Sequence, residues 1–290
     1  MVIKIFNTEI NLRDNCCQMD NEPARPVNDA YINLYTLITN KCNADCKFCC
    51  ASKKEGCFNI FKFKQAIKEI VKSARINKVS FTGGEPTLNP YVLYTCLSFV
   101  KSIDKNIFTV INTNGSYLEK ISNSIPLLNS VALSRHHYDD KINQQIFNLA
   151  LVPTAEEIKE FDLGEKLHLS CNLQKDYIGN KKEIIKYLEF ADNIGCSDVG
   201  FVSLMKFNEY CEKQFVDFND IKFDDKSGLF VIKNWNYENL CKCRNYIYLP
   251  ESANPVSVYA RHYVNPHFSG SCLVFDGQNL RTGFNGKIIY

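Results

Sequence analysis

Six short apolar segments alternate with amphipathic segments between residues 31 and 204, and this alternation limits the folds open to the chain. The predicted strands are residues 31–38, 78–82, 107–111, 130–133, 167–173 and 198–204. The intervening segments carry apolar residues at helical spacing, most clearly over 181–194, which Gly195 is expected to close. Repeated strand–helix units produce parallel strands joined by right-handed crossovers. The pattern therefore predicts an α/β fold, either an open doubly wound sheet or a partial barrel.

The pattern divides the 290 residues into three segments. Residues 1–30 are polar and irregular and are expected to form an N-terminal arm. Residues 31–204 form the strand–helix domain. Residues 205–290 are rich in aromatic residues, Asn and Gly, with no clear helix and one predicted hairpin around Asp276-Gly277. We expect this irregular or β-rich C-terminal extension to cap the active site.

Composition narrows the class of protein. The net charge of +2, with basic and acidic residues interleaved, is unlike the basic stripe of a duplex-binding protein, so a nucleic-acid partner is disfavoured. No apolar run reaches the roughly 20 residues of a membrane span, and the N-terminus does not read as a secretory signal. These features predict a cytoplasmic protein, in which some of the 14 cysteines bind a metal cluster rather than form disulfides.

Every unusual motif follows one of the first four predicted strands. Residues 42–49 hold three cysteines, residues 83–86 read GGEP, residues 112–115 read NTNG and residues 134–137 read SRHH. In parallel α/β folds, functional residues gather at the carboxyl ends of the strands. The four motifs are therefore expected to form one site.

The cysteine loop has the spacing C-x3-C-x2-C at Cys42, Cys46 and Cys49. Three thiolates on a short loop can hold three irons of a [4Fe–4S] cluster and leave the fourth iron open to another ligand. A structural zinc site would require a fourth protein ligand. The spacing therefore favours an iron–sulfur cluster, although a non-catalytic zinc or structural thiolate protein is the alternative from another class.

This spacing, followed by Gly83-Gly84-Glu85-Pro86, resembles the radical SAM superfamily. The resemblance covers about residues 31–204 and implies a partial (β/α)6 TIM-like barrel. It also implies that S-adenosylmethionine (SAM) chelates the open iron and is cleaved reductively to a 5′-deoxyadenosyl radical, which abstracts hydrogen from a substrate. The electron would come from an external donor such as flavodoxin or ferredoxin.

The resemblance also implies contacts to SAM. Phe48, just before the third cysteine, is expected to pack on the adenine. The carboxylate of Glu85 would accept from the methionyl ammonium, while Gly83 and Gly84 let the backbone approach the ligand. Further contacts to the ribose, the adenosyl hydroxyls or the methionyl carboxylate are expected from Asn112, Asn114, Ser134, Arg135 and Asn172.

His136 and His137 are less typical of the superfamily. Adjacent residues at a strand end point in opposite directions, so one of the two is expected to face the substrate and to donate to it or move a proton. The alternative is that Asp139 or Asp140, at the start of the next helix, satisfies the imidazole. The sequence does not choose between the two histidines.

Three cysteines of the C-terminal extension suggest an auxiliary cluster. Cys241, Cys243 and Cys272 could provide ligands, with Cys211 as a fourth. The alternative is that they are thiols without a metal.

The substrate is predicted to be a small molecule, because charge is balanced and no peptide-binding domain precedes the strand–helix region. The chain length, the SRHHYDD segment and the short aromatic C-terminal region resemble queuine lyases, which release a deazapurine. That resemblance implies that an acidic group such as Glu209 or Asp276 reads a guanine-like edge. A maturase or dehydrogenase with an auxiliary cluster is the alternative enzyme.

Overall fold

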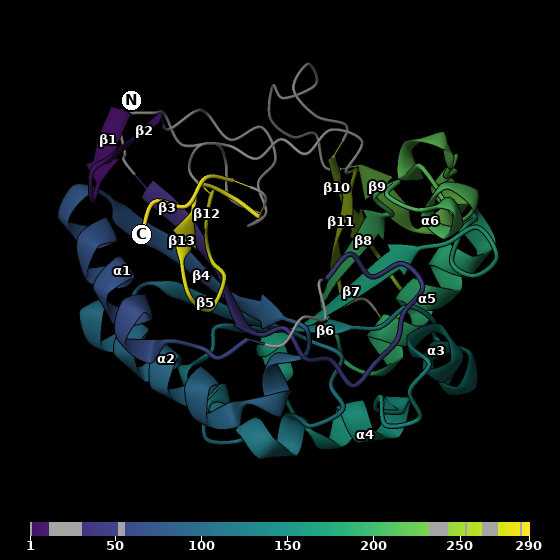
Figure 1. Ribbon diagram of the computed structural model, residues 1–290. Coiled ribbons are helices and arrows are strands. Elements are labelled where there is room, and N and C mark those ends of the chain that lie inside the picture. The colour runs from purple at the N-terminus through teal and green to yellow at the C-terminus, as the bar shows by residue number, and fades with distance from the viewer. Residues whose placement is uncertain are drawn as a thin grey trace.

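One large sheet organises the computed structural model, which describes residues 2–11, 31–51, 56–231, 243–252, 254–262, 272–284 and 286–290. Within these residues, eleven strands lie in the order β13-β12-β3-β4-β5-β6-β7-β8-β11-β10-β9. The sheet is curved, and the helices lie along its outer, convex side (Figure 1). The predicted mixed α/β class is confirmed.

The six central strands follow one another in chain order, and each pairs in parallel with the next. They are β3 (Tyr31–Thr39), β4 (Arg75–Gly83), β5 (Phe108–Thr113), β6 (Ser130–Ser134), β7 (Leu167–Leu173) and β8 (Asp198–Ser203). These strands lie where the alternation predicts them, within one to three residues at each end.

In the described parts of the connections between these strands lie five α-helices. They are α1 (Ile60–Ser73), α2 (Pro90–Ile103), α3 (Asp140–Phe147), α4 (Ala155–Glu160) and α5 (Lys181–Asn193). Gly195 follows α5 with φ +76°, in agreement with the helix end predicted there. Helix α4 was not predicted, although Thr154 and Glu157 form a capping box at its start and their spacing in the sequence indicates a helix start.

The two faces of the sheet differ in polarity because successive side chains of a strand point to opposite faces. On β4, Val79 and Phe81 are fully buried in the main hydrophobic core, beneath the helices. Lys78 and Ser80 alternate with them and line a cavity together with inward-facing residues of β5, β6, β7 and β8. The concave face of the sheet is therefore the polar one.

The C-terminal extension was expected to be irregular or β-rich, and its described residues contribute strands to both edges of the sheet. Its strands β9 (Leu229–Val231), β10 (Arg244–Tyr248) and β11 (Val256–Arg261) join one edge of the sheet, where β11 pairs in parallel with β8. Strands β12 (Cys272–Phe275) and β13 (Leu280–Arg281) join the opposite edge, where β12 pairs in parallel with β3. Residue 205 therefore does not separate two independent sheets. A short helix, α6 (Glu209–Lys213), also lies where no helix was expected.

The predicted hairpin is confirmed, since β12 and β13 are antiparallel and Gly277 lies in their turn with φ +96°. The expectation of an irregular N-terminal arm is wrong for residues 2–11. Strands β1 (Val2–Ile5) and β2 (Thr8–Asn11) form a hairpin whose isoleucines are buried in the main core. Ser73 Oγ of α1 donates to the carbonyl of Lys4 at 2.6 Å. Residues 12–30 lie outside the described residues.

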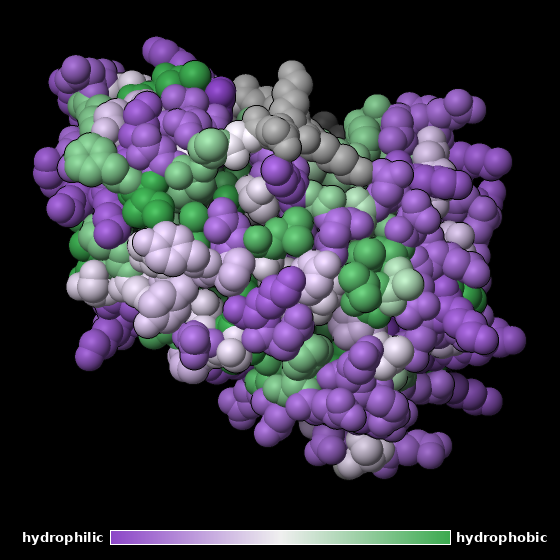
Figure 2. Space-filling model, turned by 60° about the horizontal axis from the view of Figure 1, so that its bottom comes forward, coloured by the Kyte–Doolittle hydropathy of each residue, from purple (hydrophilic) through white to green (hydrophobic). Residues whose placement is uncertain are grey.

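The outer surface mixes polar and apolar side chains. Figure 2 shows hydrophilic residues interleaved with small hydrophobic groups on the face turned toward the viewer. None of the helices in the described ranges has the length and apolar character needed to cross a membrane.

Gly83 and Gly84 let the end of β4 pack against the chain that enters the cysteine loop. Gly84 N donates to Thr39 O at 2.7 Å, and Glu85 N donates to Lys41 O at 2.8 Å. A Cβ at Gly84 would lie 2.1 Å from Lys41 O, and one at Gly83 would lie 2.2 Å from Thr39 O. The glycines thus make room for backbone of the same chain, whereas the GGEP motif was expected to make room for the ligand.

We expect Gly84→Ala to destabilise the protein by about 1–3 kcal/mol, the usual cost of overpacking, because the new methyl group meets backbone that cannot swing aside. Urea denaturation measures this change. Gly56→Ala is the matched control, since its Cβ would have Asn40 Nδ2 as nearest neighbour at 3.7 Å. Equal stability of the two variants would contradict this account.

Candidate active site

The carboxylate of Glu85 joins the ends of β4 and β5. Its Oε1 accepts from Thr87 N at 3.0 Å, Thr87 Oγ1 at 2.6 Å and Thr113 Oγ1 at 2.7 Å, and its Oε2 accepts from Asn114 N at 2.8 Å. Glu85 is 1% exposed. Burial raises the pKa of this carboxyl group, and the hydrogen bonds from Thr87, Asn114 and Thr113 oppose that rise.

These four bonds give Glu85 a positioning role that the sequence analysis did not foresee. GGEP predicted a carboxylate near SAM, but nothing in the sequence indicated that Thr87, Thr113 and the backbone of Asn114 would use both of its oxygens. A contact between Glu85 and the methionyl ammonium stays a prediction.

Asn114 extends the network to the cysteine loop. Its side-chain Nδ2 donates to Asn43 Oδ1 at 2.9 Å, and Asn43 Nδ2 donates to Ser116 Oγ at 2.8 Å. The Oδ1 of Asn114 accepts from Ser116 Oγ at 2.7 Å, which closes a ring of side-chain bonds. The ends of β4 and β5 and the cysteine loop after β3 are therefore one hydrogen-bonded unit.

The three cysteines stand on this anchored loop. Cys42 and Cys46 are half-buried, and Cys49 is exposed. Asp45 N donates to Phe147 O at 2.9 Å, which ties the loop to the end of α3, and Cys49 N donates to Cys46 O at 3.1 Å. Over the ranges that the structure describes, no three His, Cys, Asp or Glu side chains converge on a position for a single metal ion. A [4Fe–4S] cluster does not require such convergence, because each thiolate binds its own iron.

His136 lies beside the cysteine loop. Its ring stacks on Phe147 with centroids 4.7 Å apart and meets the edge of Phe48 at 4.9 Å. Its Nδ1 accepts from Asn172 N at 3.1 Å, so the neutral ring carries its proton on Nε2. Burial, together with a smaller contribution from the charge of Arg135, lowers the pKa of His136 to about 3.

His137 faces a different environment. Its Nδ1 accepts from Asp139 N at 2.9 Å, and its ring packs against Tyr138 and Tyr177. This is close to the alternative in which a residue at the start of the next helix satisfies the imidazole, although the backbone of Asp139, rather than its carboxylate, makes the bond. Of the two histidines, His136 is the one next to the cysteine loop. Contact with substrate stays a prediction for both.

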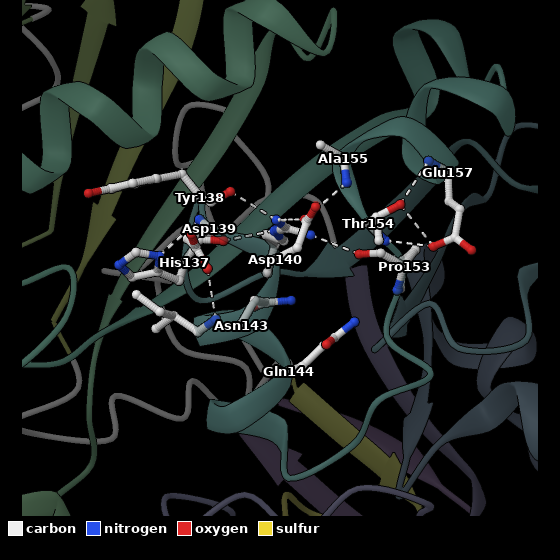
Figure 3. Close-up of polar contacts among 12 residues, drawn as sticks. His137, Tyr138, Asp139, Asp140, Asn143, Gln144, Pro153, Thr154, Ala155 and Glu157 are labelled. Atoms are coloured by element: carbon white, nitrogen blue, oxygen red, sulfur yellow. Dashed lines mark hydrogen bonds and ion pairs between the residues drawn. The ribbon is translucent and has the colours of Figure 1, made fainter.

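Arg135 points to the convex side and is 1% exposed. Its guanidinium donates to the carbonyls of His137, Tyr138 and Pro153 and to Asp140 Oδ1 at 2.5 Å. Figure 3 shows these acceptors gathered between the loop after β6 and the start of α4, where Asp140 also accepts from Ala155 N. This environment favours a structural role for Arg135 over the carboxylate contact suggested by the sequence.

The other expected SAM contacts lie at or near the ends of neighbouring strands. Asn112 on β5, Ser134 on β6 and Asn172 on β7 are half-buried. Asn112 also lines the cavity on the concave face. The alternation of β6 places Ser134 on that face, opposite to Arg135.

The cysteines expected to hold an auxiliary cluster gain no support from the described residues. Cys272 is buried on β12 beside Tyr35, and Cys243 Sγ accepts from His262 N at 3.3 Å at the start of β10. Cys211 is buried on α6, and Cys241 lies outside the described residues. The auxiliary site stays a prediction.

Comparison with known proteins agrees with this geometry. Residues 36–161 match the family model of the Radical SAM superfamily. SuiB of Streptococcus suis bound to S-adenosylmethionine has a TM-score of 0.52 and 18% identity, over 66% of this chain and 44% of SuiB. A second structure, anSMEcpe with bound AdoMet, has a TM-score of 0.51 and 16% identity, over 62% of this chain and 55% of anSMEcpe. This chain thus spans about half or less of each of these structures.

Residues 36–161 therefore carry a Radical SAM domain, and proteins of this superfamily use a [4Fe–4S] cluster and SAM. A probable GTP 3',8-cyclase of Saccharolobus solfataricus is 26% identical over 280 residues, covering 91% of this chain and 82% of the relative. An S-adenosylmethionine-dependent nucleotide dehydratase of Fibrobacter sp. (strain UWH6) is 34% identical over 208 residues, covering 61% of each chain.

We expect Glu85→Gln to lower the free energy of unfolding by about 1–3 kcal/mol, because the amide turns an acceptor into a donor that faces other donors in a buried position. Iron retained per chain after anaerobic reconstitution should fall with it. Glu69→Gln on α1 is the control, since its pair with Lys72 lies at the surface, where solvent screens the two charges and the pair adds little stability. A Glu85→Gln variant as stable as Glu69→Gln would refute the positioning role.

The depressed pKa of His136 makes stability depend on pH. In the unfolded chain, His136 binds a proton below its usual pKa near 6.5. In the folded chain, it stays neutral until the pH falls to about 3. From pH 7 to pH 5, His136 should therefore remove about 2 kcal/mol of stability. Urea denaturation should show this loss, and His136→Gln should reduce it. If the variant loses as much stability as the unmodified chain between these two pH values, the assignment is wrong.

Proposed function

We propose that this protein is a radical SAM enzyme whose cluster is held by Cys42, Cys46 and Cys49 and whose substrate is a small molecule. The observation that carries the proposal is the Glu85–Asn114–Asn43 network, which fixes the cysteine loop against two neighbouring strand ends. The partial (β/α)6 barrel and the cap over its mouth belong to the same proposal.

The donor set fits the cofactors. Three thiols on one short loop match three irons of a cubane and leave one iron for SAM. When bound, the cluster supplies one electron that cleaves SAM to methionine and a 5′-deoxyadenosyl radical. A flavodoxin or ferredoxin is the proposed electron donor.

The chain's own residues bind and orient the cofactor. Phe48 would offer its ring to the adenine, supported from behind by His136 and Phe147. Asn112, Ser134 and Asn172 would donate to or accept from the hydroxyls and the carboxylate of SAM. His136, which stays neutral, would present Nε2–H as a donor rather than act as a base. Glu85 would hold the cysteine loop in position, in addition to any contact with the methionyl ammonium.

For the substrate we propose a nucleotide or nucleobase. The similar proteins are named for GTP and for a nucleotide, and both overlap the strand–helix region of this chain. Queuine, with its deazapurine ring, falls in this chemical class. The most specific version of the proposal is therefore that the protein is a lyase that cleaves queuine. The two acidic residues that were expected to bind the guanine-like edge of queuine do not support this version. Asp276 is paired with Arg281 in the β12–β13 turn, and Glu209 is exposed at the start of α6.

Replacing Cys42, Cys46 or Cys49 by Ala should abolish SAM cleavage, because each thiolate holds one iron. The reconstituted protein, given dithionite and SAM under anaerobic conditions, should release 5′-deoxyadenosine, measured by chromatography. Cys50→Ala is the matched control. Cys50 is exposed and adjacent to Cys49, and its loss should leave cleavage close to that of the unmodified chain.

The same preparations separate the alternatives. About four irons per chain support one cluster, and about eight support the maturase or dehydrogenase with an auxiliary cluster. Zinc in place of iron, with no 5′-deoxyadenosine, would contradict the proposed function. Adding GTP or queuine separately tests the substrate, since turnover consumes one of them while SAM is cleaved.

A further inference from the structure

A cavity of about 220 Å³ lies on the concave face of the sheet. It reaches Asn112, a proposed SAM contact, and extends to the amino-terminal ends of the strands at Phe108, Ser130 and Asp198. Ligand pockets usually measure about 300–1,000 Å³, so this space suits one part of a ligand. Among the residues that the structure describes, Asn112 is the one proposed SAM contact on its wall, and no residue of the cluster loop lines it.

Two cationic side chains face this cavity from different strands. Lys78 comes from β4 and Arg261 from the end of β11, and both line the wall. Lys78 is only 6% exposed. Burial, together with a smaller contribution from the charge of Arg261, lowers the pKa of Lys78 to about 7.

A hydrogen-bonded wall holds the arginine. His168 Nδ1 lies 2.9 Å from Asp198 Oδ2, and His168 Nε2 lies 2.8 Å from the hydroxyl of Tyr259. The guanidinium of Arg261 lies over the Tyr259 ring, 4.7 Å from its centroid. Gly200 leaves space for that ring, because a Cβ there would lie 2.6 Å from it. Among the described lining residues, Asp198 is the one carboxylate and it pairs with His168, whereas Lys78 and Arg261 bring positive charge to the wall.

We propose that this cavity is a subsite for an anionic group of the substrate, a phosphoryl or carboxylate group held between Lys78 and Arg261. The inference rests on the proposed function, since it places the anion on the face of the sheet that also presents Asn112. An anion there would be attracted by both cationic side chains, and a planar guanidinium suits both oxyanions. Ser80 and Ser170 add hydroxyl donors to the same wall.

Isothermal titration calorimetry tests this subsite on the cluster-loaded protein with SAM bound. The probes are pyrophosphate, GTP and succinate, which separate a phosphoryl from a carboxylate source. Lys78→Met and Arg261→Gln should each raise the dissociation constant of the preferred probe tenfold or more. Lys101→Met is the matched control, because burial also lowers the pKa of Lys101, but this lysine bonds to Ile107 O and Asn129 away from the cavity.

The outcomes separate the two proposals. If the unmodified protein binds pyrophosphate and GTP more tightly than the Lys78→Met and Arg261→Gln variants do, the subsite is supported and its anion is a phosphoryl group. The same difference for succinate supports the subsite and identifies a carboxylate. No binding of any probe, or equal affinities in Lys78→Met, Arg261→Gln and the control, would overturn it. SAM binding and the melting temperature show whether each variant is folded. If one of the two cavity variants is not folded, the affinity of the other variant tests the subsite. If the protein binds the anion as expected but does not cleave SAM, the subsite proposal stands and the proposed function is contradicted.

Discussion

The buried carboxylate of Glu85 is the interaction on which the site depends. It accepts hydrogen bonds from residues at the ends of two strands, and Asn114 passes that constraint to Asn43 in the cysteine loop. An anion this deeply buried is stabilised only when its lone pairs are satisfied, so the four donors and the carboxylate hold one another in place. Gly83 and Gly84 are part of the same constraint, because they allow β4 to approach the loop closely enough for these bonds to form.

The rest of the molecule follows from the two-sided character of the sheet. Apolar residues on the convex side are buried under α1, α2 and α5, which makes that side rigid. The concave side keeps polar and charged groups, from Lys78 and Ser80 on β4 to Asp198 on β8. The proposed radical chemistry would need this combination, because a fixed scaffold must hold the cofactor while polar groups orient the substrate beside it.

The sequence predicted the six central strands and the edge at which the motifs meet, because both depend on local patterns of apolar and turn residues. It did not predict how residues 229–281 complete the sheet. The pairing of β11 with β8 and of β12 with β3 joins segments far apart in the chain, and such pairing leaves little local signal. It also could not decide between His136 and His137, or reveal that Arg135 turns outward. Those outcomes depend on the exact end of β6 and on the neighbours that α3, α4 and α5 provide.

The central claim is that the anchored cysteine loop holds a [4Fe–4S] cluster with one iron open to SAM. Electron paramagnetic resonance of the reduced, reconstituted protein, recorded with and without SAM, tests it most directly. We predict the signal of a reduced [4Fe–4S] cluster whose g-values change when SAM is added, since SAM binds the open iron. A cluster signal that SAM leaves unchanged, or no cluster signal after reconstitution, would contradict the claim.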